Sequence, residues 1–238
     1  MGRLDGMTAV VTGAARGLGR SVAYGFAKEG ASLHICDRIE MPEIEGATNY
    51  TLDLRDRDAS RDFAEEVARK AGRVDILVNN AAVLHYTPIG GVSDEEWDDI
   101  IAVNLTAPFV LCRAFLPFLG DGGGSIINVS SRAGAEGMKD EVAYCASKFG
   151  IEGLSRALAV EAGDNVSVNT ITPGMRIKPT MMSDAEEAAL GPDERSWEDA
   201  KAIVPAFLLL ALARGNPTGK RFEADKLSDE LKRQGVFE

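Results

Sequence analysis

Three side chains in the middle of the sequence have the types and the spacing that acid–base chemistry needs. Tyr144 and Lys148 stand four residues apart within a helical pattern, which places them on one face of a helix. Ser131 ends an apolar, strand-like run upstream of them, and the carboxyl ends of strands are where ligands bind in α/β sheets. An ammonium about 4 Å from a phenol favours the phenolate by ~4 kcal/mol at an effective dielectric constant near 20. We therefore predict that Lys148 lowers the pKa of Tyr144 toward neutrality, so that Tyr144 acts as a general acid–base on a substrate oxygen held by Ser131.

A glycine-rich turn lies near the start of the chain, between a strand pattern and a helix pattern. Glycines let the backbone turn tightly and approach a pyrophosphate, whose charge the helix N-terminus favours. Because a strand precedes it and a helix follows, we favour a dinucleotide site over a turn that only closes a strand–helix unit. The turn reads TGAARGLG, and its candidate binding residues are Gly13, Arg16, Gly17, Leu18 and Gly19.

Asp37 stands at the end of the second strand-like run and bears on the choice of nucleotide. A carboxylate at this point can accept hydrogen bonds from both ribose hydroxyls of an adenosine and repels a 2′-phosphate. Arg16 and Arg38 flank the same region and would favour NADP, but exposed arginines contribute little energy. The sequence therefore predicts NAD as the cofactor, with NADP less favoured.

The elements that must position these residues alternate along the chain. Strands are predicted over Met7–Thr12, Ser32–Cys36, Tyr50–Leu54, Val74–Asn79, Ser125–Val129 and Val166–Ile171. Helices are predicted over Gly17–Glu29, Asp58–Ala71, Asp94–Leu119 and Val142–Gly163. Several strand runs are apolar on both faces, which is typical of parallel strands covered on both sides. We therefore predict an α/β fold that forms one Rossmann domain over residues 1–238, with a doubly wound parallel sheet of about seven strands and helices on both faces.

The last third of the chain is less regular. We expect a helical flap at Ile177–Pro192, a helix at Trp197–Ala213 and a short edge strand at Lys220–Ala224, with a substrate loop around residues 175–200. The segments expected to line the substrate are Ala133–Val142, His85, Tyr86 and Met175–Met182. Arg176 and Lys178 are interpreted as ordinary loop charges rather than carboxylate ligands. Cys145 is interpreted as a small buried residue rather than a reactive thiol.

Composition excludes several classes of partner. The 238 residues carry 37 acidic and 26 basic side chains, a net charge of −11, which disfavours nucleic acid and anionic membranes. No apolar run reaches the roughly 18 residues of a membrane span, and the first residues lack the pattern of a signal peptide. Three scattered cysteines have neither disulfide nor metal-ligand spacing. We expect a cytoplasmic protein without nucleic-acid, membrane or metal partners.

With these residues assembled, the chain strongly resembles the short-chain dehydrogenase/reductase family, in its compact TGxxxGxG/YxxxK branch. The motifs that carry the resemblance are TGAARGLG at Thr12–Gly19, Asp37, LDL at Leu52–Leu54, NNAA at Asn79–Ala82, VNL around Asn104, NVSS at Asn128–Ser131, YCASK at Tyr144–Lys148 and TPG at Thr172–Gly174. The C-terminal segment TGKRFEADKLSDELKRQG lacks the Asp-Gly-Gly ending that is typical of the family.

The resemblance implies a catalytic tetrad of Asn104, Ser131, Tyr144 and Lys148, of which Ser131 and Tyr144 would also meet the substrate. The cofactor contacts that it implies are Asp53 and Leu54 at the adenine, Asn79 and Ala81 near the ribose, Lys148 at the nicotinamide ribose, and Pro173 and Gly174 at the nicotinamide. It also implies a homodimer or homotetramer, formed through the helices at Asp94–Leu119 and Val142–Gly163. From its spacing alone, Asn104 either supports a water path to Lys148 or satisfies a break in its helix, and the second is favoured.

The predicted function is that of an NAD-dependent oxidoreductase, which interconverts a small-molecule secondary alcohol and its ketone by hydride transfer. The alternative is a catalytically silent cofactor-binding scaffold or sensor of the same fold, against which the complete tetrad argues. Epimerisation or dehydration of a nucleotide sugar is disfavoured by the glycine spacing and the short C-terminal region.

Overall fold

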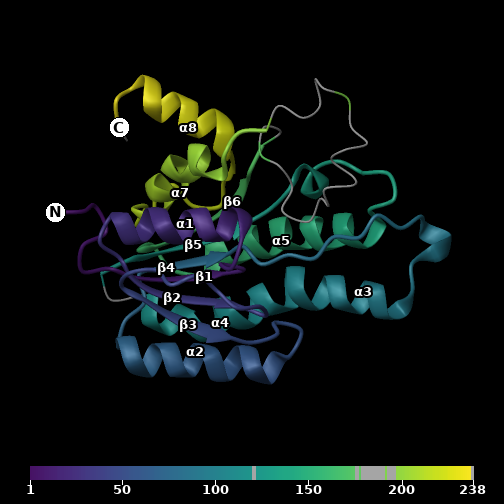
Figure 1. Cartoon of the computed structure of the whole chain (residues 1–238), viewed down its shortest axis with the longest axis horizontal. Coiled ribbons are helices and arrows are strands. Elements are labelled where there is room, and N and C mark those ends of the chain that lie inside the picture. Colours follow the sequence, from purple (N-terminus) through teal and green to yellow (C-terminus); the bar gives the residue numbers. More distant parts are fainter. Residues whose placement is uncertain (120–121, 175–176, 178–190, 192–196, 237–238) are drawn as a thin grey trace.

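The computed structural model describes residues 1–119, 122–174, 177, 191 and 197–236. It confirms the predicted fold, because seven parallel strands form one sheet in the order β3-β2-β1-β4-β5-β6-β7, with helices on both sides (Figure 1). The strands are β1 Thr8–Thr12, β2 Ser32–Asp37, β3 Ala47–Thr51, β4 Ile76–Asn79, β5 Gly124–Val129, β6 Val166–Thr172 and β7 Arg221–Glu223. The longer helices are α1 Gly17–Lys28, α2 Arg57–Ala71, α3 Asp94–Ile101, α4 Ala107–Leu119, α5 Val142–Glu161, α7 Val204–Ala211 and α8 Ala224–Arg233.

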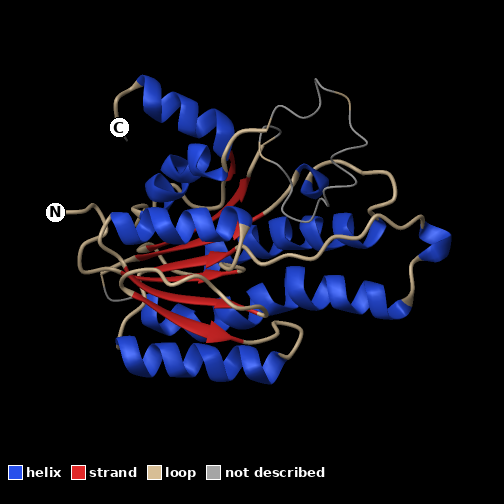
Figure 2. Cartoon of the chain, in the orientation of Figure 1, coloured by secondary structure: helices blue, strands red, loops and turns tan. Residues whose placement is uncertain are grey.

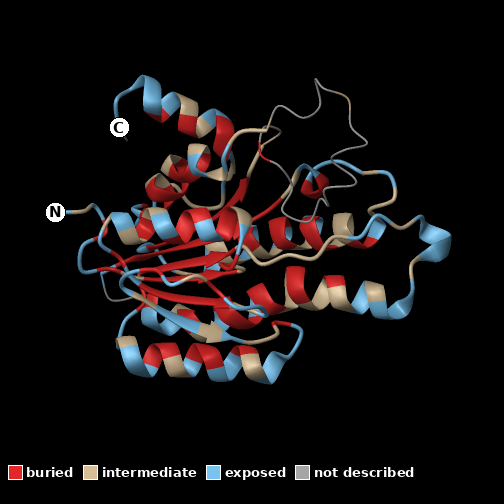
Figure 3. Cartoon of the chain, viewed as in Figure 1, coloured by how far each residue is buried: buried red, intermediate tan, exposed pale blue. Residues whose placement is uncertain are grey.

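The sheet separates two hydrophobic cores, and helices cover both of its faces (Figure 2). Alternate residues of a strand point to opposite faces, so neighbours such as Val10 and Val11 belong to different cores. Val11 packs in the core that contains α1 and α7, whereas Val10 packs with α2 and α4. The central strands are therefore buried on both faces (Figure 3), which explains their continuous apolar runs.

The third strand is the clearest error in the predicted boundaries. Strand β3 covers Ala47–Thr51 rather than Tyr50–Leu54. It is the edge strand next to β2, and its partly exposed residues give it no continuous apolar run. The apolar residues of the LDL motif instead follow the strand, where Leu52 and Leu54 line a cavity.

The long helix predicted at Asp94–Leu119 is interrupted by a π-helical turn at Ala102–Thr106, between α3 and α4. Asn104 lies within this turn. In the described part of the chain, this combined stretch is the one helix long and apolar enough to cross a membrane, and half of its most apolar window is buried in the fold. Such burial is what a core helix of a sheet protein shows.

The C-terminal part differs from the prediction in its helices. The edge strand is confirmed as β7, which pairs in parallel with β6. The helix expected at Trp197–Ala213 begins later, with a 3₁₀ turn at Ala200–Ile203 that leads into α7, where Pro205 suits the first turn because it has no N–H to donate. Helix α8 was not predicted. Apart from Ile177 and Gly191, the flap at Ile177–Pro192 lies outside the described residues, as do the other residues of Met175–Met182, including Arg176 and Lys178.

Candidate active site

A cavity of about 890 Å³ lies across the carboxyl ends of the strands, as expected for a doubly wound sheet. Most of the predicted site residues line it, although they come from distant parts of the sequence. The predicted residues in its wall are Gly13, Arg16, Leu18, Asp37, Asp53, Leu54, Ala81, Ser131, Tyr144, Lys148, Pro173 and Gly174. His85, Tyr86 and part of the Ala133–Val142 segment also lie in its wall.

The glycine turn packs tightly against the loop that follows β4. Gly13 has φ +67°, a left-handed conformation that side chains rarely adopt. A Cβ on Gly13 would lie 2.8 Å from the Cα of Ala81, so the turn has no room for one. Helix α1 begins directly after this turn, and within the described chain the side chain of its N-cap residue, Arg16, makes no capping hydrogen bond. The N-terminus of α1 therefore offers backbone N–H groups at the cavity that the N-cap side chain does not satisfy.

Asp37 is held by the backbone around it. Its Oδ2 accepts a hydrogen bond from the Ala15 amide at 3.0 Å, and its Oδ1 accepts from the amides of Arg38 at 2.7 Å and Ile39 at 3.3 Å. These bonds join the end of β2 to the glycine turn, and they fix a carboxylate in the cavity wall.

A second carboxylate, Asp53, lies on the same side of the cavity. Arg55 forms ion pairs with Asp53 and with Asp99 of α3. The hydrogen bond from Arg55 is the main reason why the pKa of Asp53 lies below its ordinary value. Arg55 also lines the cavity and was not among the predicted residues.

Tyr144 lies in the first turn of α5 and is partly buried beside Ser131. Burial raises the pKa of Tyr144 to about 12, and a hydrogen bond with Ser131 acts in the opposite direction. The predicted lowering of this pKa is therefore wrong for the protein chain by itself. The desolvation of the phenolate outweighs the attraction that was expected from Lys148.

Lys148 is one helical turn further along α5 and is 2% exposed. Its Nζ donates a hydrogen bond to the carbonyl oxygen of Val129 at 2.8 Å and lies 5.4 Å from the centroid of the Tyr144 ring. Burial lowers the pKa of Lys148 to about 8, while Glu152 acts to raise it. The ammonium therefore remains mostly protonated at neutral pH and loses its charge as the pH rises through about 8.

Asn104 does not line the cavity but supports its wall from behind. Its Oδ1 accepts from the Val83 amide at 2.8 Å, and its Nδ2 donates to the Val83 carbonyl at 2.8 Å and to Ser147 Oγ at 3.1 Å. Asn104 thereby ties the π turn to the loop after β4 and to α5. It satisfies backbone groups, although they belong to a neighbouring loop and not to its own helix.

Three other predicted residues also lie outside the cavity lining. Gly17 and Gly19 shape the turn. Asn79 is buried beneath the cavity and donates to Asn128 Oδ1 at 2.8 Å. Its neighbour Asn80 lies in the cavity wall instead, and donates to the backbone carbonyl of Thr12 at 2.9 Å.

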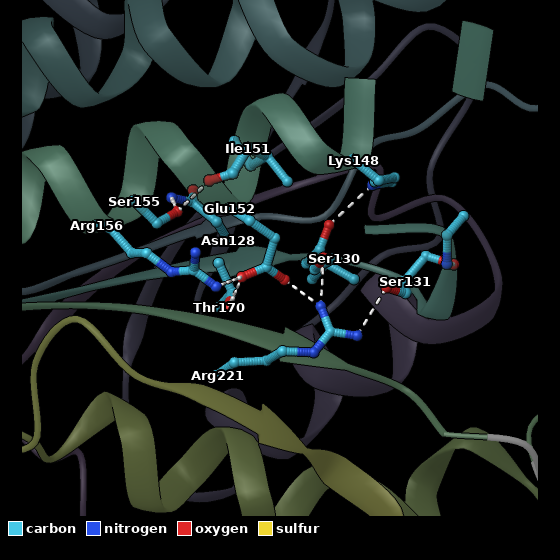
Figure 4. Close-up of polar contacts among 12 residues, drawn as sticks. Asn128, Ser130, Ser131, Lys148, Ile151, Glu152, Ser155, Arg156, Thr170 and Arg221 are labelled. Carbon is cyan, nitrogen blue, oxygen red and sulfur yellow. Dashed lines mark hydrogen bonds and ion pairs between the residues drawn. The ribbon is translucent and has the colours of Figure 1, made fainter. Parts of the chain in front are cut away.

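The prediction also missed an ion pair near Ser131 between a buried glutamate and a partly buried arginine. Arg221 lies in the cavity wall, and its guanidinium contacts both Glu152 of α5 and the loop after β5 (Figure 4). Two signals were available in the sequence: a charged residue at the start of a predicted edge strand, and a glutamate four residues after Lys148. Neither signal indicates the other, because the two residues are far apart in the chain.

Comparison with known proteins gives consistent matches. A family model described as short chain dehydrogenase matches residues 7–190. A D-threitol dehydrogenase from Mycolicibacterium smegmatis is 42% identical over 187 residues, which cover 72% of this chain and 70% of that protein. Carveol dehydrogenase from Mycobacterium avium in complex with NAD has a TM-score of 0.82 at 30% identity, with 95% of this chain and 99% of that chain covered. A protein assigned as an NAD(P)-dependent gluconate 5-dehydrogenase from Beutenbergia cavernae, with bound NADP at low occupancy, has a TM-score of 0.79 at 33% identity, and the match covers 93% and 96% of the two chains.

Proposed function

The chain belongs to the short-chain dehydrogenase family, and from this premise we propose that it is an NAD-dependent oxidoreductase that interconverts a secondary alcohol and a ketone. One observation carries the proposal. A single cavity contains the glycine turn and Asp37 at one end and Ser131, Tyr144 and Lys148 at the other. A nucleotide-binding turn and an acid–base group in one cavity are what hydride transfer to or from a bound substrate requires.

The residues of the cavity fit a nicotinamide dinucleotide. Gly13 and the uncapped start of α1 provide close backbone approach and N–H donors for a pyrophosphate. Asp53 and Leu54 would meet the adenine, Ala81 the adjoining ribose region, and Pro173 and Gly174 the nicotinamide. We propose that Asn79 contributes from below, through its hydrogen bond to β5.

We propose NAD rather than NADP as the cofactor. Asp37 places a fixed negative charge in the wall where the adenosine ribose would lie, and this charge would repel a 2′-phosphate. Arg16, Arg38 and Arg55 line the same region and act in the other direction. The two solved relatives named above contain NAD in one case and NADP in the other, so the proposal rests on Asp37.

In the proposed reaction, Ser131 donates a hydrogen bond to the substrate oxygen while Tyr144 exchanges a proton with it. A nicotinamide held by Pro173, Gly174 and Lys148 would supply the hydride chemistry at the substrate carbon. A phenol with a pKa near 12 holds its proton at neutral pH, so Tyr144 is ready to donate a proton to the oxygen of a ketone being reduced. For the alcohol to be oxidised, the phenol must first lose that proton, which the positive charge of Lys148 assists. Asn104 completes the tetrad as the residue that fixes the loop around Val83 against α5.

We also propose the form of the protein in solution and the location of its substrate. A homodimer or homotetramer would cover aromatic side chains that α3, α4 and α5 leave exposed, namely Trp97, Phe109 and Phe149. The substrate would enter beside Tyr86, which lines the cavity. We expect a soluble, cytoplasmic enzyme, and light scattering coupled to gel filtration measures its assembly.

A substrate screen tests the proposed function. The full chain is incubated with NAD or NADP and a panel of secondary alcohols, sugars, polyols, steroids and hydroxy acids, and absorbance at the reduced-nicotinamide band is followed. The matching ketones are tested with NADH. We expect turnover with at least one member, faster with NAD. Binding of NADH without turnover on any member would instead favour the silent scaffold.

A further inference from the structure

Arg221 makes three contacts of different kinds at the back of the cavity. As the first residue of β7, it pairs with Thr170 of β6, and its guanidinium reaches over that strand toward β5 and α5 (Figure 4). Nη2 donates to the backbone carbonyl of Ser131 at 2.8 Å, and Nη1 donates to Ser130 Oγ at 3.2 Å and forms an ion pair with Glu152. A planar guanidinium can hold such a set of acceptors at once, which a lysine cannot do.

Glu152 is the residue that requires this arginine. Its side chain is 4% exposed, and a buried carboxylate is very costly unless it is paired and hydrogen-bonded. Thr170 Oγ1 donates to its Oε2 at 2.9 Å. Arg156 also approaches it, but at 3.8 Å and with a side chain that is 67% exposed, so its contribution is small. Arg221 is therefore the principal charge partner of Glu152.

The ion pair lies directly behind the acid–base residues. Tyr144, Lys148 and Glu152 follow one another at intervals of four along α5, so they share one helix face. The carbonyl of Ser131 accepts from Arg221 and also from the Gly134 amide at 2.9 Å. The backbone of Ser131 is thus anchored to β7 on one side and to its own turn on the other, and its hydroxyl oxygen accepts from the Ala133 amide at 3.2 Å. The Ser131 side chain faces Tyr144 across the cavity wall that both residues line.

We propose that Arg221 is a positioning residue, which uses its ion pair with Glu152 to hold Ser131 at the distance from Tyr144 that proton exchange needs. The inference rests on the roles proposed for Ser131 and Tyr144. Arg221 belongs to the C-terminal segment TGKRFEADKLSDELKRQG, which lacks the usual Asp-Gly-Gly ending of the family, so the proposal gives this segment a role in catalysis. Edge strand β7 then acts on catalysis through a side chain that never has to touch the reacting atoms.

A pair of variants separates positioning from simple stabilisation. Arg221→Met leaves the Glu152 carboxylate buried without its main partner, so it should unfold at a lower temperature. The double variant Arg221→Met/Glu152→Met replaces the ion pair with apolar side chains, which often restores stability, but it does not restore the contact with the Ser131 carbonyl. A purely structural role requires both stability and activity to return in the double variant, whereas a positioning role requires activity to remain low.

The position of Ser131 can be observed without any substrate. The full chain, labelled with ¹³C at the tyrosine Cζ, contains four tyrosines, and Tyr144→Phe identifies the signal of Tyr144 by its loss. We expect the Tyr144 signal to shift in both Arg221 variants, because the Ser131 hydroxyl moves relative to the phenol. It should stay in place in Arg156→Met, the matched control that removes the exposed arginine on the same carboxylate. An unchanged Tyr144 signal in the folded double variant would overturn the proposal.

Kinetics give the second measurement. With a substrate from the screen, we expect kcat to fall about 10- to 100-fold in both Arg221 variants, the cost of a small misplacement of a catalytic group, while the Kd for NADH is unchanged. Arg221→Lys should recover stability more than kcat, since one ammonium cannot hold both Glu152 and Ser131. Return of kcat together with stability in the double variant contradicts the positioning role. If the wild type turns over no substrate, the proposed function fails, and the tyrosine spectrum still decides the role of Arg221.

Discussion

The two ends of the cavity are built in different ways. At the nucleotide end, the backbone holds the groups in place: Gly13 takes a left-handed conformation, and Asp37 is fixed by amides that include its immediate neighbours. At the catalytic end, side chains hold one another across the fold: Arg221 contacts Ser131 and Glu152, which precede it by 90 and 69 residues.

This difference separates local from distributed positioning. The nucleotide end depends on a few backbone conformations, so a change of one side chain there should alter what binds and leave the chemistry intact. The catalytic end depends on buried polar groups, each of which is costly to leave without a partner. A change there should reduce turnover, stability or both, and leave nucleotide binding largely intact.

The largest expected effect comes from removing the phenol at the catalytic end. Tyr144→Phe deletes the one oxygen that is proposed to exchange a proton with the substrate, so kcat should fall about 10³-fold, within the range of general acid–base catalysis. The Kd for NADH, measured by fluorescence, should remain at the wild-type value, because the nucleotide end is unaltered.

Tyr24→Phe is the control for this variant, because Tyr24 is an exposed tyrosine of α1. It should leave both quantities unchanged. Undiminished turnover in Tyr144→Phe would remove the proposed acid–base group, and loss of NADH binding would show that the two ends are not independent.

The same contrast explains what the sequence could predict. The glycine turn, Asp37 and the Tyr144–Lys148 spacing are local patterns, and each is followed or preceded by an element with a clear period. The sheet follows from the alternation of such elements. The third strand was misplaced because an edge strand needs no continuous apolar run. Helix α8 was missed although its sequence is amphipathic, with Ala224 and Leu231 buried, so here the sequence did contain a usable pattern.

The environment of the catalytic residues could not be predicted from local sequence patterns. The pKa of a phenol depends on the balance between desolvation and nearby charge, and the spacing of Tyr144 and Lys148 fixes neither the depth of burial nor the partner of Lys148. The Val129 carbonyl, which that lysine contacts, gives no signal in the sequence. The pairing of Arg221 with Glu152 likewise depends on the register of β7 against β6.

A smaller effect tests the burial of Lys148 through the pH dependence of stability. Its pKa is about 8 in the folded protein and 10.5 ordinarily, so between these values the unfolded chain binds a proton that the folded chain releases. The free energy of unfolding therefore increases as the pH rises from about 8 to 10.5, by roughly 3 kcal/mol in all. Below pH 8 the folded protein bears the full cost of burying the charged lysine.

Lys148→Met removes this dependence. Urea unfolding at several pH values from 7 to 10 should show the wild type gaining stability relative to the variant as the pH rises. Lys139→Met, at an exposed lysine, should follow the wild type at every pH. A difference between the wild type and Lys148→Met that stays constant over this range would contradict the burial of a partly neutral lysine at the catalytic end.

The smallest expected effect lies at the nucleotide end and concerns preference alone. Asp37→Asn keeps one of the two oxygens that accept from backbone amides and removes the charge that would face a 2′-phosphate. The preference for NAD over NADP in kcat/KM should therefore fall about tenfold, the equivalent of roughly 1.4 kcal/mol. The kcat at saturating NAD should not change, because no group at the catalytic end is altered. Glu40→Gln, at an exposed carboxylate nearby, is the control and should leave the preference for NAD unchanged.

If the wild type already prefers NADP, the positive charge of the arginines around Asp37 outweighs its negative charge, and the proposed cofactor is wrong. Asp37→Asn could instead lower kcat at saturating NAD as strongly as Tyr144→Phe does. Positioning at the nucleotide end would then not be local, because a change at the end of β2 would have to act across β1 and β4 to affect the phenol.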